Sequence, residues 1–170
     1  MKISVFGLGH VGLVSAAVLA EVHTVYGVDI DPAVVEAVRR ARAPFYEPGL
    51  DPLIQAGLNQ DSLHVTDDAA QAIAQTSLSM ICVGTPASET GEADLSAVKR
   101  VLDEIGSALR HTSAYHVVVM RSTVPPSVWS ELKTHLEETS GRTVGRDVGL
   151  CANPEFLREG QAIADFKRPP

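Results

Sequence analysis

The sequence has little cysteine and no histidine pattern typical of a metal site. Its two cysteines, Cys82 and Cys151, both lie in apolar, strand-like runs. Two such residues make no disulfide framework and suit a reducing compartment such as the cytoplasm. We expect both to be buried apolar side chains, because a nucleophilic thiolate needs an exposed, electropositive setting. The six histidines show no ligand spacing, so we predict no metal.

Basic residues are also scarce. The chain has 14 Lys and Arg against 21 Asp and Glu, which gives a formal net charge of −7. Nucleic-acid surfaces need clustered Lys and Arg to contact phosphates, so we expect no nucleic-acid partner. Any anionic ligand must then be held locally, by backbone N–H groups and helix ends.

No long hydrophobic run is uninterrupted. Residues 3–20, which follow Lys2, superficially resemble a signal peptide or a membrane span, but Gly7, Gly9 and Gly12 interrupt them. Glycines weaken a spanning helix, so a strand, a turn and a helix explain this stretch better, and we expect no membrane contact. With 170 residues, 45% of them hydrophobic, the chain is one substantial domain or the first part of a larger protein.

A G-x-G-x-x-G motif occupies residues 7–12, directly after the apolar run 3–6. The first glycine permits a tight turn, the second lets backbone approach a pyrophosphate, and the third lets the next helix pack closely. That helix, predicted over residues 11–20, presents its N-terminus to the pyrophosphate. Asp29 ends the next apolar run, where a carboxylate binds ribose hydroxyls and repels a 2′-phosphate; the alternative is a solvated acid at a strand end. The pattern predicts a site for NAD rather than NADP.

Apolar runs alternate with helical patterns along the chain. Strands are predicted at residues 3–6, 24–28, 63–65, 78–83, 115–120 and 148–151. Helices are predicted at residues 11–20, 32–42, 50–58, 69–76, 95–109 and 127–139, the second of them capped by Asp31. This alternation predicts an α/β fold of the doubly wound Rossmann type, with a six-stranded, mainly parallel sheet in one domain over residues 1–170.

Polar residues follow several predicted strands, at the sheet edge where open α/β folds bind ligands. Thr85 and Thr123 offer hydroxyls to ribose, to a carboxamide or to water, although both residues also suit helix caps. His10 lies inside the glycine turn, where it either stacks near a cofactor or packs beneath it. Glu155 and Glu159 are four residues apart and would share a helix face if Asn153-Pro154 opens a helix. They are candidates for proton transfer and for holding substrate hydroxyls, or else form a solvated face.

Six motifs follow one another along the whole chain. They are Phe6-Gly7-Leu8-Gly9-His10-Val11-Gly12, Gly27-Val28-Asp29, Glu47-Pro48-Gly49-Leu50, Ile81-Cys82-Val83-Gly84-Thr85-Pro86, Arg121-Ser122-Thr123-Val124-Pro125 and Asn153-Pro154-Glu155-Phe156-Leu157-Arg158-Glu159-Gly160. In this order they resemble the nucleotide-sugar 6-dehydrogenases, the UDP-glucose and GDP-mannose dehydrogenase family. Arg121 and the ending Pro169-Pro170 are more similar to the GDP-mannose branch, whereas His10 stands where the family usually has tyrosine.

The resemblance implies a reaction and roles for residues. The family oxidises the sugar C6 alcohol to a carboxylate with two NAD, through a cysteine-linked thioester, in cytoplasmic enzymes of polysaccharide biosynthesis. It implies NAD contacts at Gly7, Gly9, His10, Val11, Gly12, Asp29, Thr85 and Thr123. It further implies that Thr123 positions water, that Glu155 assists thioester hydrolysis and that Glu159 contacts the nucleotide sugar.

The resemblance also bears on what these 170 residues do alone. The nucleophilic cysteine, the catalytic lysine and the central helix through which family members form homo-oligomers lie in a later part of such proteins, beyond residue 170. We therefore expect this chain to bind NAD without completing the oxidation. GDP-mannose is the favoured substrate; UDP-glucose, or a non-catalytic module that senses NAD, is the alternative.

Overall fold

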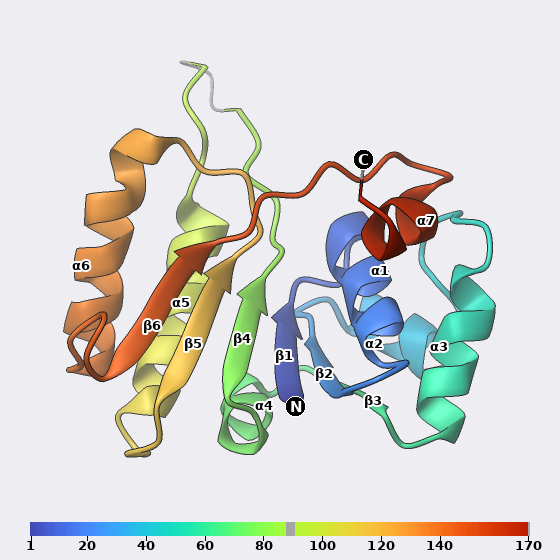
Figure 1. Ribbon diagram of the computed structural model, residues 1–170, viewed down its shortest axis with the longest axis horizontal. Coiled ribbons are helices and arrows are strands. Elements are labelled where there is room, and N and C mark those ends of the chain that lie inside the picture. Colours follow the sequence, from blue (N-terminus) through green and yellow to red (C-terminus); the bar gives the residue numbers. More distant parts are fainter. Residues whose placement is uncertain (88–90, 170) are drawn as a thin grey trace.

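The computed structural model describes residues 1–87 and 91–169 (Figure 1). Within these residues the strands form a six-stranded, all-parallel sheet in the order β3-β2-β1-β4-β5-β6. The strands are β1 (Lys2–Phe6), β2 (Thr24–Val28), β3 (Leu63–Thr66), β4 (Leu78–Ile81), β5 (His116–Met120) and β6 (Val148–Ala152). This is the predicted doubly wound Rossmann order, and its winding reverses between β1 and β4.

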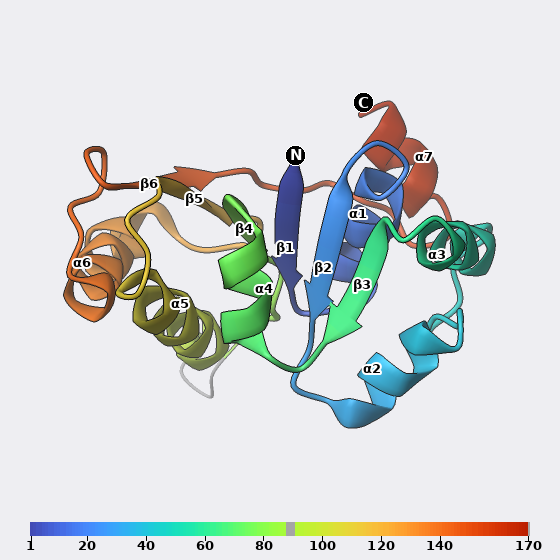
Figure 2. The same ribbon diagram turned by 90° about the horizontal axis from the view of Figure 1, so that it is seen from below.

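Helices connect the strands and cover both faces of the sheet. They are α1 (His10–Leu19), α2 (Pro32–Arg39), α3 (Leu50–Asn59), α4 (Ala69–Gln75), α5 (Ser96–Leu109), the 3-10 turn η1 (Pro126–Val128), α6 (Trp129–Ser140) and α7 (Ala162–Lys167). Figure 2 shows α1 and α7 on one side of the sheet and α4, α5 and α6 on the other. None of the helices within the described residues is long and apolar enough to cross a membrane.

Two hydrophobic cores hold these layers together. One packs α1, α2, α3 and α7 against β1 and β2, with Val5 and Leu13 fully buried. The other packs α4, α5 and α6 against the opposite face, with Leu102 and Leu136 fully buried. Burying a leucine side chain contributes roughly 1.5–3 kcal/mol, so both cores help to fix the strands whose ends carry the polar motifs.

Three predicted element boundaries differ from the structure by two or three residues, whereas the others agree to within one residue. The second helix ends at Arg39 rather than at residue 42, and Ala41 takes a positive φ of 58°. Strand β4 ends at Ile81 rather than at residue 83, and the Val83 carbonyl accepts the Ser122 hydroxyl at 2.6 Å. The 3-10 turn η1 precedes α6, which starts at Trp129 rather than at residue 127.

The segment after β6 also differs from the prediction. Residues 153–158 form no helix, so Glu155 and Glu159 do not share a helix face. The Glu155 carboxylate accepts the N–H of Leu157 at 2.5 Å, a local side-chain bond that competes with helical bonding. The short helix α7, which the sequence pattern did not predict, follows at Ala162–Lys167.

The burial predicted for Cys151 is wrong. This residue lies near the carboxyl end of β6, the edge strand, and is exposed. An apolar run indicates a strand but not whether both of its faces are covered, and Figure 1 shows no helix in front of β5 and β6. Cys82, just after β4, is half-buried.

Candidate functional site

The polar motifs meet at the carboxyl edge of the sheet, around the switch point between β1 and β4. In Figure 1 the arrowheads of β1, β4, β5 and β6 point toward this edge, from which the loops after these strands rise. Such a crevice is where open α/β sheets bind ligands. Two cavities lie along it, one on each side of the glycine turn.

The glycine turn between β1 and α1 has the geometry that the motif predicts. Gly7 takes a positive φ of 87°, a conformation that side chains disfavour. A Cβ on Gly12 would lie 1.7 Å from the Gly7 carbonyl oxygen, so α1 approaches the turn more closely than any side chain permits. Gly9 has open space where its Cβ would be, and no side chain caps the helix there. The N-terminus of α1 therefore offers its N–H groups and open room to an anion.

Asp29 follows β2 and faces the turn. Its Oδ2 accepts the N–H of Leu8 at 2.6 Å, and its Oδ1 accepts the N–H of Asp31 at 2.9 Å. A carboxylate has about four acceptor positions, so each oxygen retains capacity for a ribose hydroxyl. Asp31 itself caps α2, as predicted, by accepting the N–H of Ala33 at 2.8 Å.

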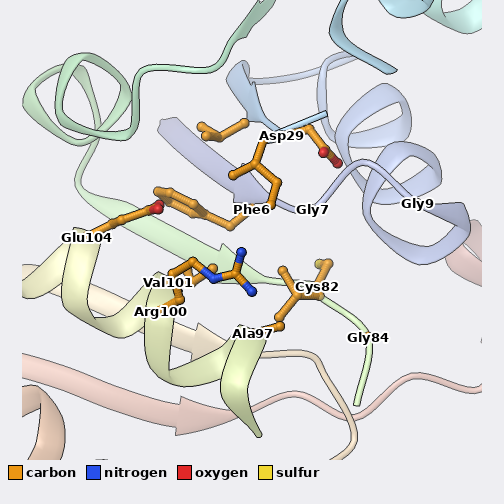
Figure 3. Close-up of a pocket in the computed structure, with 13 residues that line it drawn as sticks. Phe6, Gly7, Gly9, Asp29, Cys82, Gly84, Ala97, Arg100, Val101 and Glu104 are labelled. Carbon is orange, nitrogen blue, oxygen red and sulfur yellow. The ribbon is translucent and has the colours of Figure 1, made fainter. Parts of the chain in front are cut away.

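The first cavity lies between the β1–β2 edge and helix α5 (Figure 3), with a volume of about 280 Å³. Its walls are mainly apolar, and Asp29 belongs to its lining. Figure 3 shows Arg100 and Glu104 reaching toward it from α5. An adenosine requires apolar walls on either side of its flat adenine base and a carboxylate near its ribose, and this cavity has both.

The second cavity, of about 300 Å³, lies toward β5 and β6. It brings together many of the predicted residues, and its lining includes Gly9, His10, Val11, Thr85, Thr123 and Glu155. The Thr85 hydroxyl donates to the Thr123 carbonyl oxygen at 2.9 Å, which joins the loops after β4 and β5. Neither threonine caps a helix, because α5 is preceded by Leu95 and η1 by Pro125. Glu159 does not line this cavity and is exposed in the turn before α7.

Arg121 lies at the floor of the second cavity and is buried, with 8% of its surface exposed. Its Nη1 donates to Oδ1 of Asn153 at 2.6 Å, and its guanidinium carbon lies 5.2 Å from the centre of the Phe166 ring. Its Nε has no hydrogen-bond partner among the described residues. An arginine side chain stays charged at all ordinary pH values, so the cavity has a fixed positive charge in its floor.

Cys82 lines both cavities but is not suited to act as a nucleophile. Burial raises the pKa of its thiol to about 12, an effect that the nearby Arg121 opposes and Glu155 reinforces. At neutral pH the sulfur is therefore protonated, which agrees with the apolar role predicted for it.

The comparisons with known proteins agree with this geometry. The protein family described as "UDP-glucose/GDP-mannose dehydrogenase family, NAD binding domain" matches residues 1–170. The chain belongs to this family. It is 45% identical, over its whole length, to the GDP-mannose 6-dehydrogenase of Pseudomonas savastanoi pv. phaseolicola and covers 39% of that protein. It is 42% identical to the UDP-glucose 6-dehydrogenase of Rhizobium meliloti (strain 1021), covering 99% of this chain and 38% of that protein.

A solved structure shares the fold of this NAD-binding domain closely. The crystal structure of a ternary complex of GDP-mannose dehydrogenase from Pseudomonas aeruginosa superposes with a TM-score of 0.98 at 42% identity. The match covers 100% of this chain and 39% of that one. The chain thus spans about two fifths of the length of the relatives that it matches.

The residues of this NAD-binding domain fit the cofactor of their family. Gly9 leaves room for a pyrophosphate at a helix end, and the first cavity joins apolar walls to the Asp29 carboxylate. Sequence patterns did not assign functions to Arg100, Glu47 or the Arg121 side chain. Glu47 lies in a recognised motif, but its hydrogen bonds to His10, Gly160 and Ala162 join residues that are distant in the sequence.

Proposed function

We propose that this NAD-binding domain serves a nucleotide-sugar 6-dehydrogenase that oxidises the C6 alcohol of GDP-mannose to a carboxylate. The observation that carries the proposal is the match over the whole of this chain, at 45% identity, to a GDP-mannose 6-dehydrogenase. Arg121 before Ser122-Thr123 supports the same branch of the family. So does the Pro169-Pro170 ending, although Pro170 lies outside the described residues. Converting an alcohol to a carboxylate removes four electrons and so requires two NAD.

In this proposal the first cavity and the glycine turn bind the adenosine and the pyrophosphate. Gly7, Gly9 and Gly12 shape the turn, and the N–H groups at the start of α1, including those of His10 and Val11, face the pyrophosphate. Asp29 accepts hydrogen bonds from ribose hydroxyls and repels a 2′-phosphate, which selects NAD over NADP.

The second cavity then takes the nicotinamide half and the reacting carbon. When bound, NAD supplies the hydride acceptor. Thr85 and Thr123 bind a ribose, a carboxamide or a water molecule there through their hydroxyl groups. Thr123 positions the water that attacks the thioester. Glu155, which lines the same cavity, accepts a proton from that water during hydrolysis. Glu159, on the exposed turn, contacts the nucleotide sugar.

The proposal assigns the remaining steps to parts of the family's proteins that correspond to positions after residue 170. Residues 1–170 are then one NAD-binding domain, and the nucleophilic cysteine, the catalytic lysine and the contacts between subunits belong to the later parts. We expect residues 1–170 alone to bind NAD and to leave a nucleotide sugar unoxidised.

Two measurements test the proposal. Isothermal titration of residues 1–170 should show tighter binding of NAD than of NADP, and preference for NADP would contradict the role of Asp29. The product of the whole gene, assayed by NADH absorbance, should form two NADH per GDP-mannose and turn over UDP-glucose more slowly. Faster turnover of UDP-glucose would assign the chain to the other branch, and turnover of neither sugar would favour a module that senses NAD.

A further inference from the structure

Glu47 is a buried carboxylate whose hydrogen-bond partners come from both ends of the chain. Its side chain is 1% exposed and lies in the loop between α2 and α3. Its Oε2 accepts from Nε2 of His10 at 2.9 Å and from the N–H of Gly160 at 2.7 Å. Its Oε1 accepts from the N–H of Ala162 at 2.9 Å. One side chain thus joins the glycine turn to the turn that follows Glu159.

Glu47 also caps a helix to which it does not belong. Ala162 is the first residue of α7, and the residue before it, Gln161, makes no capping bond with its own side chain. Burial alone raises the pKa of Glu47, but the hydrogen bonds from His10, Gly160 and Ala162 outweigh it and lower that pKa below its ordinary value. At neutral pH the carboxylate is therefore charged, and a negative charge stabilises the N-terminal end of a helix.

The segment from Asn153 to Ala162 is consequently held at both ends. At its start, Asn153 accepts the bond from Arg121, just after β5. At its end, the backbone at Gly160 and Ala162 is bound to Glu47. Glu155 and Glu159 lie between these two attachments.

We propose that Glu47 is a positioning residue, which holds the segment bearing Glu155 and Glu159 against the glycine turn through His10. This inference rests on the proposed function, in which that segment acts on the nicotinamide side. Neither His10 nor residues 153–162 line the first cavity, whereas His10 and Glu155 line the second. Loss of Glu47 should therefore disturb binding in the second cavity and spare the first.

The decisive variant is Glu47→Gln, in which the side chain keeps its size but one oxygen is replaced by an NH₂ group that accepts no hydrogen bond. In residues 1–170 we expect the affinity for NAD to fall by roughly fivefold or more, which corresponds to the loss of about one hydrogen bond. The affinity for AMP should stay the same. Amide hydrogen exchange at Gly160 and Ala162 should become about tenfold faster or more. Equal losses for NAD and AMP, or no loss for either, would overturn the proposal.

Asp51→Asn is the matched control. Asp51 is also a carboxylate that holds the loop before α3, since it accepts the Ala43 N–H at 2.8 Å and an Arg42 N–H at 3.0 Å. It makes no hydrogen bond to His10, Gly160 or Ala162. This variant should leave NAD affinity and exchange at Gly160 unchanged. If it matches Glu47→Gln in both, Glu47 only stabilises its own loop and the inference fails.

A second variant keeps the test valid if Glu47→Gln does not fold, which circular dichroism would reveal. His10→Phe removes the donor to Glu47 but keeps a ring to pack on Phe45, whose ring centre lies 5.0 Å from that of His10. NAD should slow exchange at Gly160 and Ala162 in the unsubstituted chain and have little effect there in His10→Phe. Equal slowing in both would show that His10 transmits nothing. If the unsubstituted chain binds no NAD, the proposed function fails, while exchange in the free variants still tests the role of Glu47.

Discussion

The carboxylate of Asp29 accepts the N–H of Leu8 at 2.6 Å, so the residue that we propose to select the cofactor also holds the glycine turn in place. The turn and this acid, which we propose to bind ribose, are therefore one structural unit. A substitution at Asp29 acts on both.

Asp29→Asn should weaken NAD binding by about tenfold and reduce the preference for NAD over NADP. The amide loses the negative charge that repels a 2′-phosphate and one of its two acceptor oxygens. Isothermal titration with both cofactors measures the change. The control is Asp31→Asn, because asparagine caps helices as well as aspartate does and affinity should stay the same. An unchanged preference in Asp29→Asn would place the selection elsewhere.

Two glycine variants should separate folding from binding. Gly12→Ala places a Cβ 1.7 Å from the Gly7 carbonyl oxygen, so α1 must shift and Tm should fall by several degrees. Gly9→Ala meets open space and should fold normally, yet its methyl group occupies the room that the pyrophosphate needs. We expect Gly9→Ala to keep its Tm and lose most NAD affinity in titration. Full affinity in that variant would contradict a pyrophosphate at the turn.

The stability of the chain should fall in mild acid because of His116. This residue is buried, and its Nε2 lies 2.8 Å from the Ser79 hydroxyl oxygen. Burial, together with the smaller effect of the Arg142 charge, lowers the pKa of His116 from 6.5 to about 4. Between these pH values the unfolded chain binds the proton and the folded chain does not, so the free energy of unfolding decreases as pH falls, by at most about 3 kcal/mol.

Urea unfolding at several pH values between 6.5 and 4 measures this contribution. His116→Gln cannot titrate, so its free energy of unfolding should depend less on pH over that interval, whatever its value at pH 7. Parallel curves for the two proteins would show that His116 does not contribute.

Arg121 should favour reduced over oxidised cofactor. The oxidised nicotinamide ring carries a positive charge that the reduced ring lacks, and the Arg121 guanidinium has a fixed positive charge at the floor of the second cavity. Arg121→Met should therefore shift the ratio of NAD to NADH affinities toward NAD, by roughly 3- to 10-fold.

Arg100→Met is the control for this prediction. It also removes one positive charge, but from the first cavity, where we place the adenosine that is identical in the two cofactor forms. The ratio of NAD to NADH affinities should therefore be the same in Arg100→Met as in the unsubstituted chain. Fluorescence titration with NADH and calorimetry with NAD measure both ratios, and equal shifts in the two variants would exclude a local effect of Arg121.

Local chemistry made the fold and the cofactor turn predictable. Glycines at 7, 9 and 12 between a strand and a helix have few other uses, and an aspartate after the next strand completes the pattern. The spacing of Glu155 and Glu159 was misleading, because the backbone N–H of Leu157 donates to the Glu155 carboxylate where such spacing favours a helix. The attachments of Glu47 and Arg121 join residues far apart in the sequence, which no local pattern specifies.

The position of β1 between β2 and β4 has a consequence for folding. Strands β1 to β3 pair with near neighbours in sequence, as do β4 to β6, whereas pairing of Ile3 with Leu78 closes the longest loop in the sheet. Closing a long loop costs the most chain entropy, so this pairing is expected to form late. The two cavities lie on either side of this pairing between β1 and β4. A bound dinucleotide would span it, and should slow unfolding by linking two halves that otherwise separate first.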